Sequence, residues 1–287
     1  MTYRKYFLCV AFLLSSTDYS QAQNRDSLDA KAVQYLQNQD FGHAVPILKE
    51  AAAAGSPKSQ YNYAVCLLQG AGVAQNDSLA NIFLERSANQ NYVDAEFKLA
   101  SSYRMGRGVQ ANSQKAVYWY SRAAELGDVE SELDLAIYYR GDNGIPRDTV
   151  KMLYWLTRAA TQRNPKDDTV ATSSSGPVTV STTVGYQTSA EISQIRYSLA
   201  SMYLAGELVP KDSLQAYMWL LITNENKKDF PASKIMDGPC QQELIDQITV
   251  LESHLSSDQQ HEAEQEAVKL LGRPLQNLAR KAKLDLD

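Results

Sequence analysis

The sequence predicts an all-α fold, a right-handed α/α superhelical solenoid built from antiparallel helix pairs. Three observations lead to this prediction. Like residues recur every 36 positions, each period contains two amphipathic stretches, and glycines or polar capping residues separate the stretches. The chain has 287 residues, of which 44% are hydrophobic and 21% charged, which is the ordinary composition of a folded globular protein.

Small and aromatic residues form the columns of this repeat. The alanine columns are Ala52, Ala88, Ala124 and Ala160; Ala64, Ala100 and Ala136; and Ala44, Ala80 and Ala116. The aromatic column is Phe83, Trp119, Trp155 and Trp219. Between Trp155 and Trp219 the step is 28 residues longer than 36, so one repeat carries an insertion before the frame resumes. We expect the alanines to allow close helix contacts and the aromatic residues to fill the core between pairs.

Residues 93–127 illustrate how each period divides into two helices. Apolar residues recur at helical spacing in 93–105 and again in 113–126. Gly106 interrupts the pattern, and Asn112 can cap the second helix with its side-chain oxygen. The equivalent capping positions are Asn76, Asp148 and Asp212. A single helix pair cannot bury its apolar stripe, so neighbouring pairs must stack.

The segment 95–128, AEFKLASSYRMGRGVQANSQKAVYWYSRAAELGD, closely resembles the Sel-one-like repeat, a 36-residue relative of the tetratricopeptide repeat. It follows the family pattern A-x-x-x-L-G-x-x-Y-x-x-G-x-G-V and then K-A-x-x-W-Y-x-x-A-A-x-x-G, with Ala100 in place of the first glycine. The resemblance extends over residues 27–225. It implies the solenoid fold and a protein-binding role, but no particular partner. The expected units are a degenerate one at 27–55 and full ones at 57–91, 93–127, 129–162 and 191–225.

Two further segments lie outside the repeat pattern. Residues 163–190 form the insertion, whose Ser, Thr and Val content is compatible with a small hairpin or a mobile loop; we favour the loop. Residues 240–284 predict a helical cap that covers the last repeat, with helices at 241–255 and 258–271. The stretch 257–260 has the pattern of a capping box for the second of these helices.

The N-terminus has the pattern of a secretory signal peptide over residues 1–22. Arg4 and Lys5 precede an apolar run at 7–14, and small residues follow at 20–22. We expect cleavage after Ala22 and a secreted or periplasmic protein. The apolar run is much shorter than the roughly 20 residues that span a bilayer, so no membrane span is expected.

The remaining composition gives no sign of chemistry. The net charge of −5 and the lack of a basic cluster argue against a nucleic-acid partner. Cys66 and Cys240 could form a disulfide in an oxidising compartment, although we expect two separate thiols. His254 and His261 have no third ligand nearby in the sequence. We therefore expect no metal, no cofactor and no catalytic residue.

A partner-binding surface follows from the related tetratricopeptide fold, in which the first helix of each pair lines the concave face. Carried over by position, this gives Tyr61, Phe97 and Tyr197, with Arg104 and Arg140 in another inner row. These residues could bind a peptide, with arginine pairing to carboxylates; alternatively, the aromatic residues pack in the core and the arginines are merely solvated. We predict a non-catalytic interaction scaffold or adaptor exported to the cell envelope. The alternatives are a regulator of, or enzyme acting on, cell-wall glycans, and a structural spacer.

Overall fold

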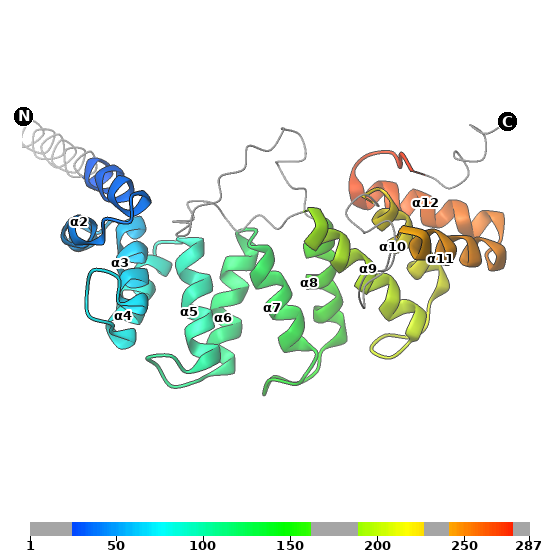
Figure 1. Ribbon diagram of the computed structural model, residues 1–287. Helices are drawn as coiled ribbons and strands as arrows, with labels where there is room; N and C mark the ends of the chain where they lie inside the picture. Colours follow the sequence, from blue (N-terminus) through cyan, green and yellow to red (C-terminus); the bar gives the residue numbers. More distant parts are fainter. Residues whose placement is uncertain (1–24, 162–188, 227–240, 278–287) are drawn as a thin grey trace, which may run out of the picture. The chain divides into compact units, whose positions relative to one another are not determined.

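The computed structural model describes residues 25–161, 189–226 and 241–277, and these residues form helices and turns with no strand. The chain divides into two compact units, with the boundary between Asp128 and Val129. Within each unit, successive helices pack as antiparallel pairs (Figure 1). The predicted all-α solenoid of helix pairs is confirmed. The expected signal peptide and most of the 163–190 insertion lie outside the described residues.

The first unit contains three helix pairs. The leading pair consists of residues 25–37 and α2, and it corresponds to the degenerate repeat expected at 27–55. The next two pairs correspond to the full repeats expected at 57–91 and 93–127. Each helix contacts the one that follows it along the chain. The helices are α2 (Phe41–Ala53), α3 (Pro57–Gln69), α4 (Asp77–Ala88), α5 (Val93–Met105) and α6 (Ser113–Glu125).

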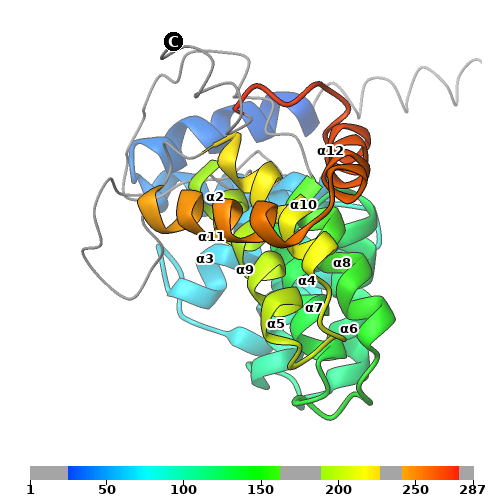
Figure 2. The same ribbon diagram turned by 90° about the vertical axis from the view of Figure 1, so that its right-hand side faces the viewer.

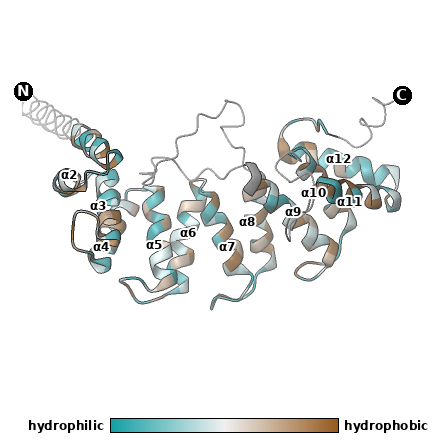
Figure 3. Ribbon diagram, in the orientation of Figure 1, coloured by the Kyte–Doolittle hydropathy of each residue, from teal (hydrophilic) through white to brown (hydrophobic). Residues whose placement is uncertain are grey.

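The second unit contains two repeats and a C-terminal pair. Its helices are α7 (Val129–Tyr139), α8 (Thr149–Thr161), α9 (Ser189–Ala205), α10 (Ser213–Asn224), α11 (Gln241–His254) and α12 (Ser257–Leu271). Both α11 and α12 pack against α10 (Figure 2), as expected of a terminal cap. Hydrophilic residues predominate on α12 (Figure 3). The capping box begins one residue earlier than predicted, because the Ser256 hydroxyl accepts the Gln259 N–H and the Gln259 side chain accepts the Ser256 N–H.

The polar residue before the second helix of each repeat forms hydrogen bonds with the start of that helix and with the end of the first helix. The Asn112 side chain accepts the Lys115 N–H at 2.9 Å, which caps α6. Its own backbone N–H donates to the Tyr103 carbonyl at 2.9 Å, near the end of α5. The predicted caps at Asn76, Asp148 and Asp212 are confirmed by the same pair of contacts.

The alanine and aromatic columns form the core of both units. All ten alanines of the three columns are at most 3% exposed, so helix backbones approach closely around them. Trp119 and Trp155 are 7% and 8% exposed, and Phe83 packs edge-on against Tyr63 with 4.9 Å between ring centroids. The structural role predicted for the aromatic column is confirmed.

Within each unit, the carbonyl of an alanine near the end of a second helix accepts a side-chain hydrogen bond from the following pair, as seen at Ala52, Ala88 and Ala160. Such a carbonyl has no donor within its own helix, and at Ala52 and Ala88 a backbone N–H of the following turn also donates to it. Gln60 Nε2 donates to the Ala52 carbonyl at 3.1 Å, and Arg122 Nη2 donates to the Ala88 carbonyl at 3.1 Å. In the second unit, Arg196 Nε donates to Ala160 at 2.8 Å. We call these contacts the carbonyl locks, because each fixes one helix pair against the pair before it.

Two of the arginines near these helix ends also pair with buried glutamates. Arg122 lies 2.8 Å from Glu96, whose side chain is fully buried, and its guanidinium lies 5.0 Å from the Trp119 ring centroid. Thirty-six residues later, Arg158 lies 2.8 Å from the fully buried Glu132 and 5.4 Å from the Trp155 ring centroid. Each arginine is thus held between a carboxylate and an aromatic face.

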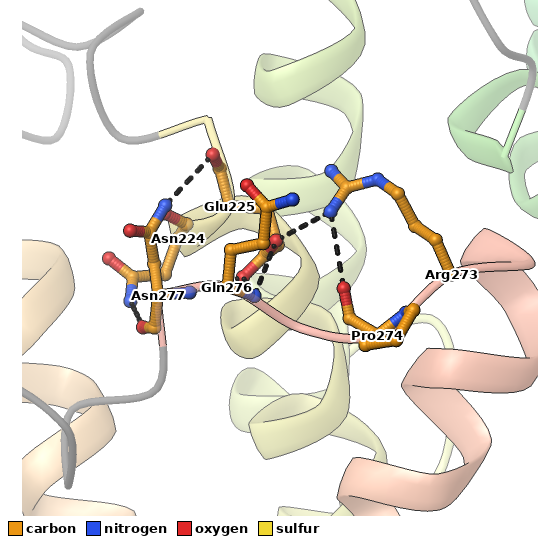
Figure 4. Close-up of polar contacts among 6 residues, drawn as sticks. All are labelled: Asn224, Glu225, Arg273, Pro274, Gln276 and Asn277. Atoms are coloured by element: carbon orange, nitrogen blue, oxygen red, sulfur yellow. Dashed lines mark hydrogen bonds and ion pairs between the residues drawn. The ribbon is translucent and has the colours of Figure 1, made fainter.

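The C-terminal residues close over the end of α10. The Glu225 carboxylate, 2% exposed, accepts hydrogen bonds from Arg273 Nη1 and from the Gln276 and Asn277 N–H groups, each at 2.8 Å (Figure 4). The Asn224 and Asn277 side chains each donate to the other residue's backbone carbonyl. The cap therefore covers α10 with side-chain packing and provides donors to the Asn224 carbonyl and the Glu225 carboxylate at its end.

In the two full repeats of the first unit, the loop within the pair approaches the preceding pair so closely that glycine is required. Gly108 has φ +68°, and a Cβ placed there would lie 2.6 Å from the Asp77 carbonyl oxygen. Gly72 stands 36 residues earlier and makes the equivalent approach to Phe41. The loop of one pair therefore packs on the start of the second helix of the preceding pair.

We predict that Gly108→Ala lowers the free energy of unfolding by roughly 2–5 kcal/mol, from backbone strain plus the collision with Asp77. Gly127→Ala is the matched control, because Gly127 also has a positive φ but has open space around it. Its expected cost is roughly 1–2 kcal/mol. Urea denaturation of both variants measures the difference, and equal costs would show that the close loop contact contributes nothing.

Candidate functional site

The structure buries two of the predicted aromatic binding residues at least in part. Tyr61 is 7% exposed and packs against Tyr92, with 5.3 Å between ring centroids. Burial and the nearby Asp94 carboxylate raise the pKa of the Tyr61 phenol, so it stays neutral. Phe97 is half-buried and meets Tyr120 at 5.7 Å between ring centroids. Both side chains contribute to packing within the first unit.

The other predicted residues lie in different environments. Arg104 is exposed on α5, also in the first unit. Arg140 is exposed just after α7, in the second unit, and pairs with Asp142. Tyr197, on α9, accepts a hydrogen bond from Gln247 Nε2 at 2.9 Å. Of the five residues, Tyr61, Phe97 and Arg104 therefore belong to the first unit, and Arg140 and Tyr197 belong to the second.

A groove lies between α3 and α5 of the first unit, one helical turn beyond the predicted row. It has a volume of about 130 Å³ and is lined by Val65, Leu68, Gln69, Lys98, Ser101, Ser102, Met105 and Arg107. Val65 and Ser101 follow Tyr61 and Phe97 by four residues, which places them on the same helix faces. The groove is therefore lined by the same two helices as the predicted residues Tyr61 and Phe97, by side chains one turn further along.

The charged groups of the groove have different roles. Arg107 donates to the Leu68 carbonyl and lies 3.1 Å from Asp77, and its own carbonyl accepts from Asn81 Nδ2 at 2.7 Å. Its side chain is therefore engaged within the unit. Lys98 is exposed, with its ammonium 5.8 Å from the Phe97 ring centroid. The groove combines apolar walls with one cation directed to the surface.

Comparisons with known proteins agree with this architecture. The profile of the Sel1 repeat family matches residues 57–92, 93–128, 129–164 and 193–223. The chain belongs to the Sel1 repeat family. Sel1 repeats generally mediate protein–protein interactions, so the groove lies on a fold suited to that role. No curated protein sequence matches the chain.

Solved structures of Sel1 repeat proteins resemble this one in fold. A Sel1 repeat protein from Oxalobacter formigenes has a TM-score of 0.53 and 21% identity, over 80% of this chain and 88% of that chain. A protective antigen of uropathogenic Escherichia coli with the same repeat fold has a TM-score of 0.47 and 17% identity, over 92% of this chain and 65% of that chain.

Groups with reactive or metal-binding chemistry are engaged or dispersed. Cys66 is a buried free thiol, and burial raises its pKa to about 11, which keeps it unreactive near neutral pH. Cys240 lies outside the described residues. His254 and His261 are exposed and contact Val250 and Gln265 respectively. Over residues 25–161, 189–226 and 241–277, no cluster of three or more His, Cys, Asp or Glu side chains could hold a metal ion.

The described part of the chain also has no helix that is both long and apolar enough to cross a membrane.

Glu96 has the altered pKa that an active-site carboxyl often shows, but its surroundings are structural. Burial raises the pKa of Glu96 to about 7; Arg122 opposes this rise and Glu125 adds to it. The side chain is fully buried, and the groove lining does not include it. In this Sel1 repeat protein, Glu96 belongs to the packing between helices.

We predict that Glu96 makes the protein more stable as the pH falls from 7.5 to 5. The folded state binds a proton near pH 7, whereas the unfolded chain binds it only near pH 4.5, so acidification favours folding. Between these two pH values, Glu96→Gln should reduce the change in the free energy of unfolding by roughly 1–3 kcal/mol. Glu125→Gln should leave most of that change in place. Urea titrations at both pH values provide the measurement; an unchanged dependence in Glu96→Gln would refute the assignment.

Proposed function

We propose that this chain is an exported, non-catalytic adaptor that binds a protein partner through the α3–α5 groove. The observation that carries the proposal is the combination of apolar groove walls with exposed cations on α5. Val65, Leu68 and Met105 supply the walls and Lys98 lies in the lining, while Arg104 is exposed on the same helix outside the lining. The general role of Sel1 repeats supports protein binding as the function of this surface.

The chemistry of the groove defines the segment that it would bind. A volume of about 130 Å³ accommodates one apolar side chain and its immediate backbone. Met105 is 61% exposed, and its flexible thioether can adapt to side chains of different shape. Lys98 and Arg104 would pair with a carboxylate next to that side chain. The expected ligand is therefore a peptide segment in which an aspartate or glutamate adjoins an apolar residue.

Export is supported by the signal-peptide pattern of residues 1–22. A protein so processed would begin at Gln23 and meet its partner in the periplasm or outside the cell. Binding, rather than chemistry on cell-wall glycans, is the function supported by the groove, since its lining carries no carboxylate.

We predict that residues 23–287 used as bait enrich a protein partner from an envelope extract, and that charge reversal on α5 weakens this complex. Lys98→Glu and Arg104→Glu should each lower the affinity by roughly tenfold or more, because they would repel the partner's carboxylate. Lys49→Glu, on the exposed face of α2, is the matched control and should have little effect.

Circular dichroism would verify that each variant stays folded. Arg140→Glu tests whether the partner also contacts the second unit. If Lys98→Glu and Arg104→Glu bind as tightly as the unaltered protein, the groove is not the binding site.

A further inference from the structure

A second pocket lies wholly within the second unit, where α12 packs on α10. Its volume is about 300 Å³, at the lower end of the range for ligand pockets. It is lined by Thr157, Tyr203, Leu214, Gln215, Met218, Trp219, Glu262, Ala263, Glu266 and Leu270. These residues come from α8, α9, α10 and α12, so the last repeat and the terminal cap form the pocket together.

The cap helix covers a row of residues that the other repeats leave exposed. Ile82, Tyr118 and Tyr154 follow one another at 36-residue steps and are 47%, 55% and 56% exposed. Met218 is the equivalent residue of the last repeat, yet it is only 2% exposed. The buried alanines of α12, Ala263 among them, allow this helix to lie close to α10. The pocket is the space that remains along the edge of that contact.

The last repeat lacks a cation that the two preceding repeats contain. The Lys115 ammonium lies 5.0 Å from the Tyr103 ring centroid, and Lys151 has the same 5.0 Å relation to Tyr139. The equivalent tyrosine of the last repeat is Tyr203, and Gln215 stands where the lysine would be. Both residues line the pocket. A glutamine amide carries no charge, so Gln215 leaves the Tyr203 ring without the lysine that the two preceding repeats place over their tyrosines.

The cap supplies carboxylates to the same space. Glu262 and Glu266 stand one helical turn apart on α12, where hydrophilic residues predominate (Figure 3), and both line the pocket. Glu266 also lies 3.3 Å from Lys269, but both side chains are largely exposed, and such pairs contribute little and exchange easily. An aromatic face with two nearby carboxylates is the arrangement that binds an ammonium group.

We propose that this pocket binds a lysine side chain of a partner protein, with an adjoining apolar residue against Leu214 and Leu270. The lysine ammonium would take the place over Tyr203 that Lys115 and Lys151 occupy over their own tyrosines. Glu262 and Glu266 would balance its charge. This site is separate from the α3–α5 groove and requires the opposite charge on its ligand, so either site can fail without the other.

The test is an NMR titration of the full chain with the peptide acetyl-Leu-Lys-Leu-amide. We expect saturable shifts of the Trp219 indole N–H and the Tyr203 ring. Acetyl-Leu-norleucine-Leu-amide, which has the same length without the ammonium, should bind at least about tenfold more weakly. Glu262→Gln with Glu266→Gln should weaken lysine-peptide binding by about tenfold or more. Glu207→Gln, an exposed carboxylate outside the pocket, should leave it unchanged.

Gln215→Lys is the decisive variant, because it introduces the lysine of the two preceding repeats and should block the peptide from within. Its unfolding midpoint in urea shows that the last repeat remains folded. Equal affinity for the lysine and norleucine peptides would overturn the proposal, since the pocket would then be merely apolar. Lysine-peptide binding by Gln215→Lys at full affinity, or no saturable shift in the unaltered protein, would also overturn it.

Discussion

Within each unit, the hydrogen bonds that join the end of a second helix to the next pair are the interaction on which the repeat stack depends. The final carbonyls of an α-helix have no donor within the helix, and turn N–H groups such as those of Gly55 and Asn91 meet part of this need. The next pair provides a side-chain donor, as Gln60, Arg122 and Arg196 each do. Because a hydrogen bond requires a defined distance and direction, each carbonyl lock sets the register of its pair. The alanine columns allow the approach, and the locks fix its position.

The fold could be predicted from the sequence because the same packing requirement selects the same residue type at the same position of successive repeats. A close helix contact requires alanine at Ala88 and again at Ala124, and a helix start requires a polar cap such as Asn112. The carbonyl locks could not be predicted in this way. Their acceptors are backbone atoms, and their donors change in type and helix, from Gln60 on α3 to Arg122 on α6. The buried partners of the arginines were missed for the same reason, since Glu96 resembles an ordinary helix-surface residue.

The candidate sites depend on residues that depart from the repeat. The binding residues predicted from the sequence include Tyr61 and Phe97, whose burial is set by neighbours such as Tyr92 and Tyr120 that the periodicity does not reveal. The groove and the cap pocket instead involve Lys98 and Gln215, at positions where the repeats differ. A repeated residue serves packing in every unit, whereas a residue found in one unit is free to recognise a ligand. Comparing each unit with its neighbours would have drawn attention to both positions.

Removal of the Arg122 side chain from its lock tests this account most directly. Arg122→Met should lower the free energy of unfolding by roughly 3–5 kcal/mol, because the Ala88 carbonyl and the buried Glu96 carboxyl both lose their arginine partner. Arg86→Met is the matched control: Arg86 occupies the same repeat position and lies 5.3 Å from the Phe83 ring centroid, but Gln60 replaces the glutamate. Its expected cost is about 1 kcal/mol or less. Urea denaturation measures both; equal, small losses would contradict the claim that these locks hold the repeats in register.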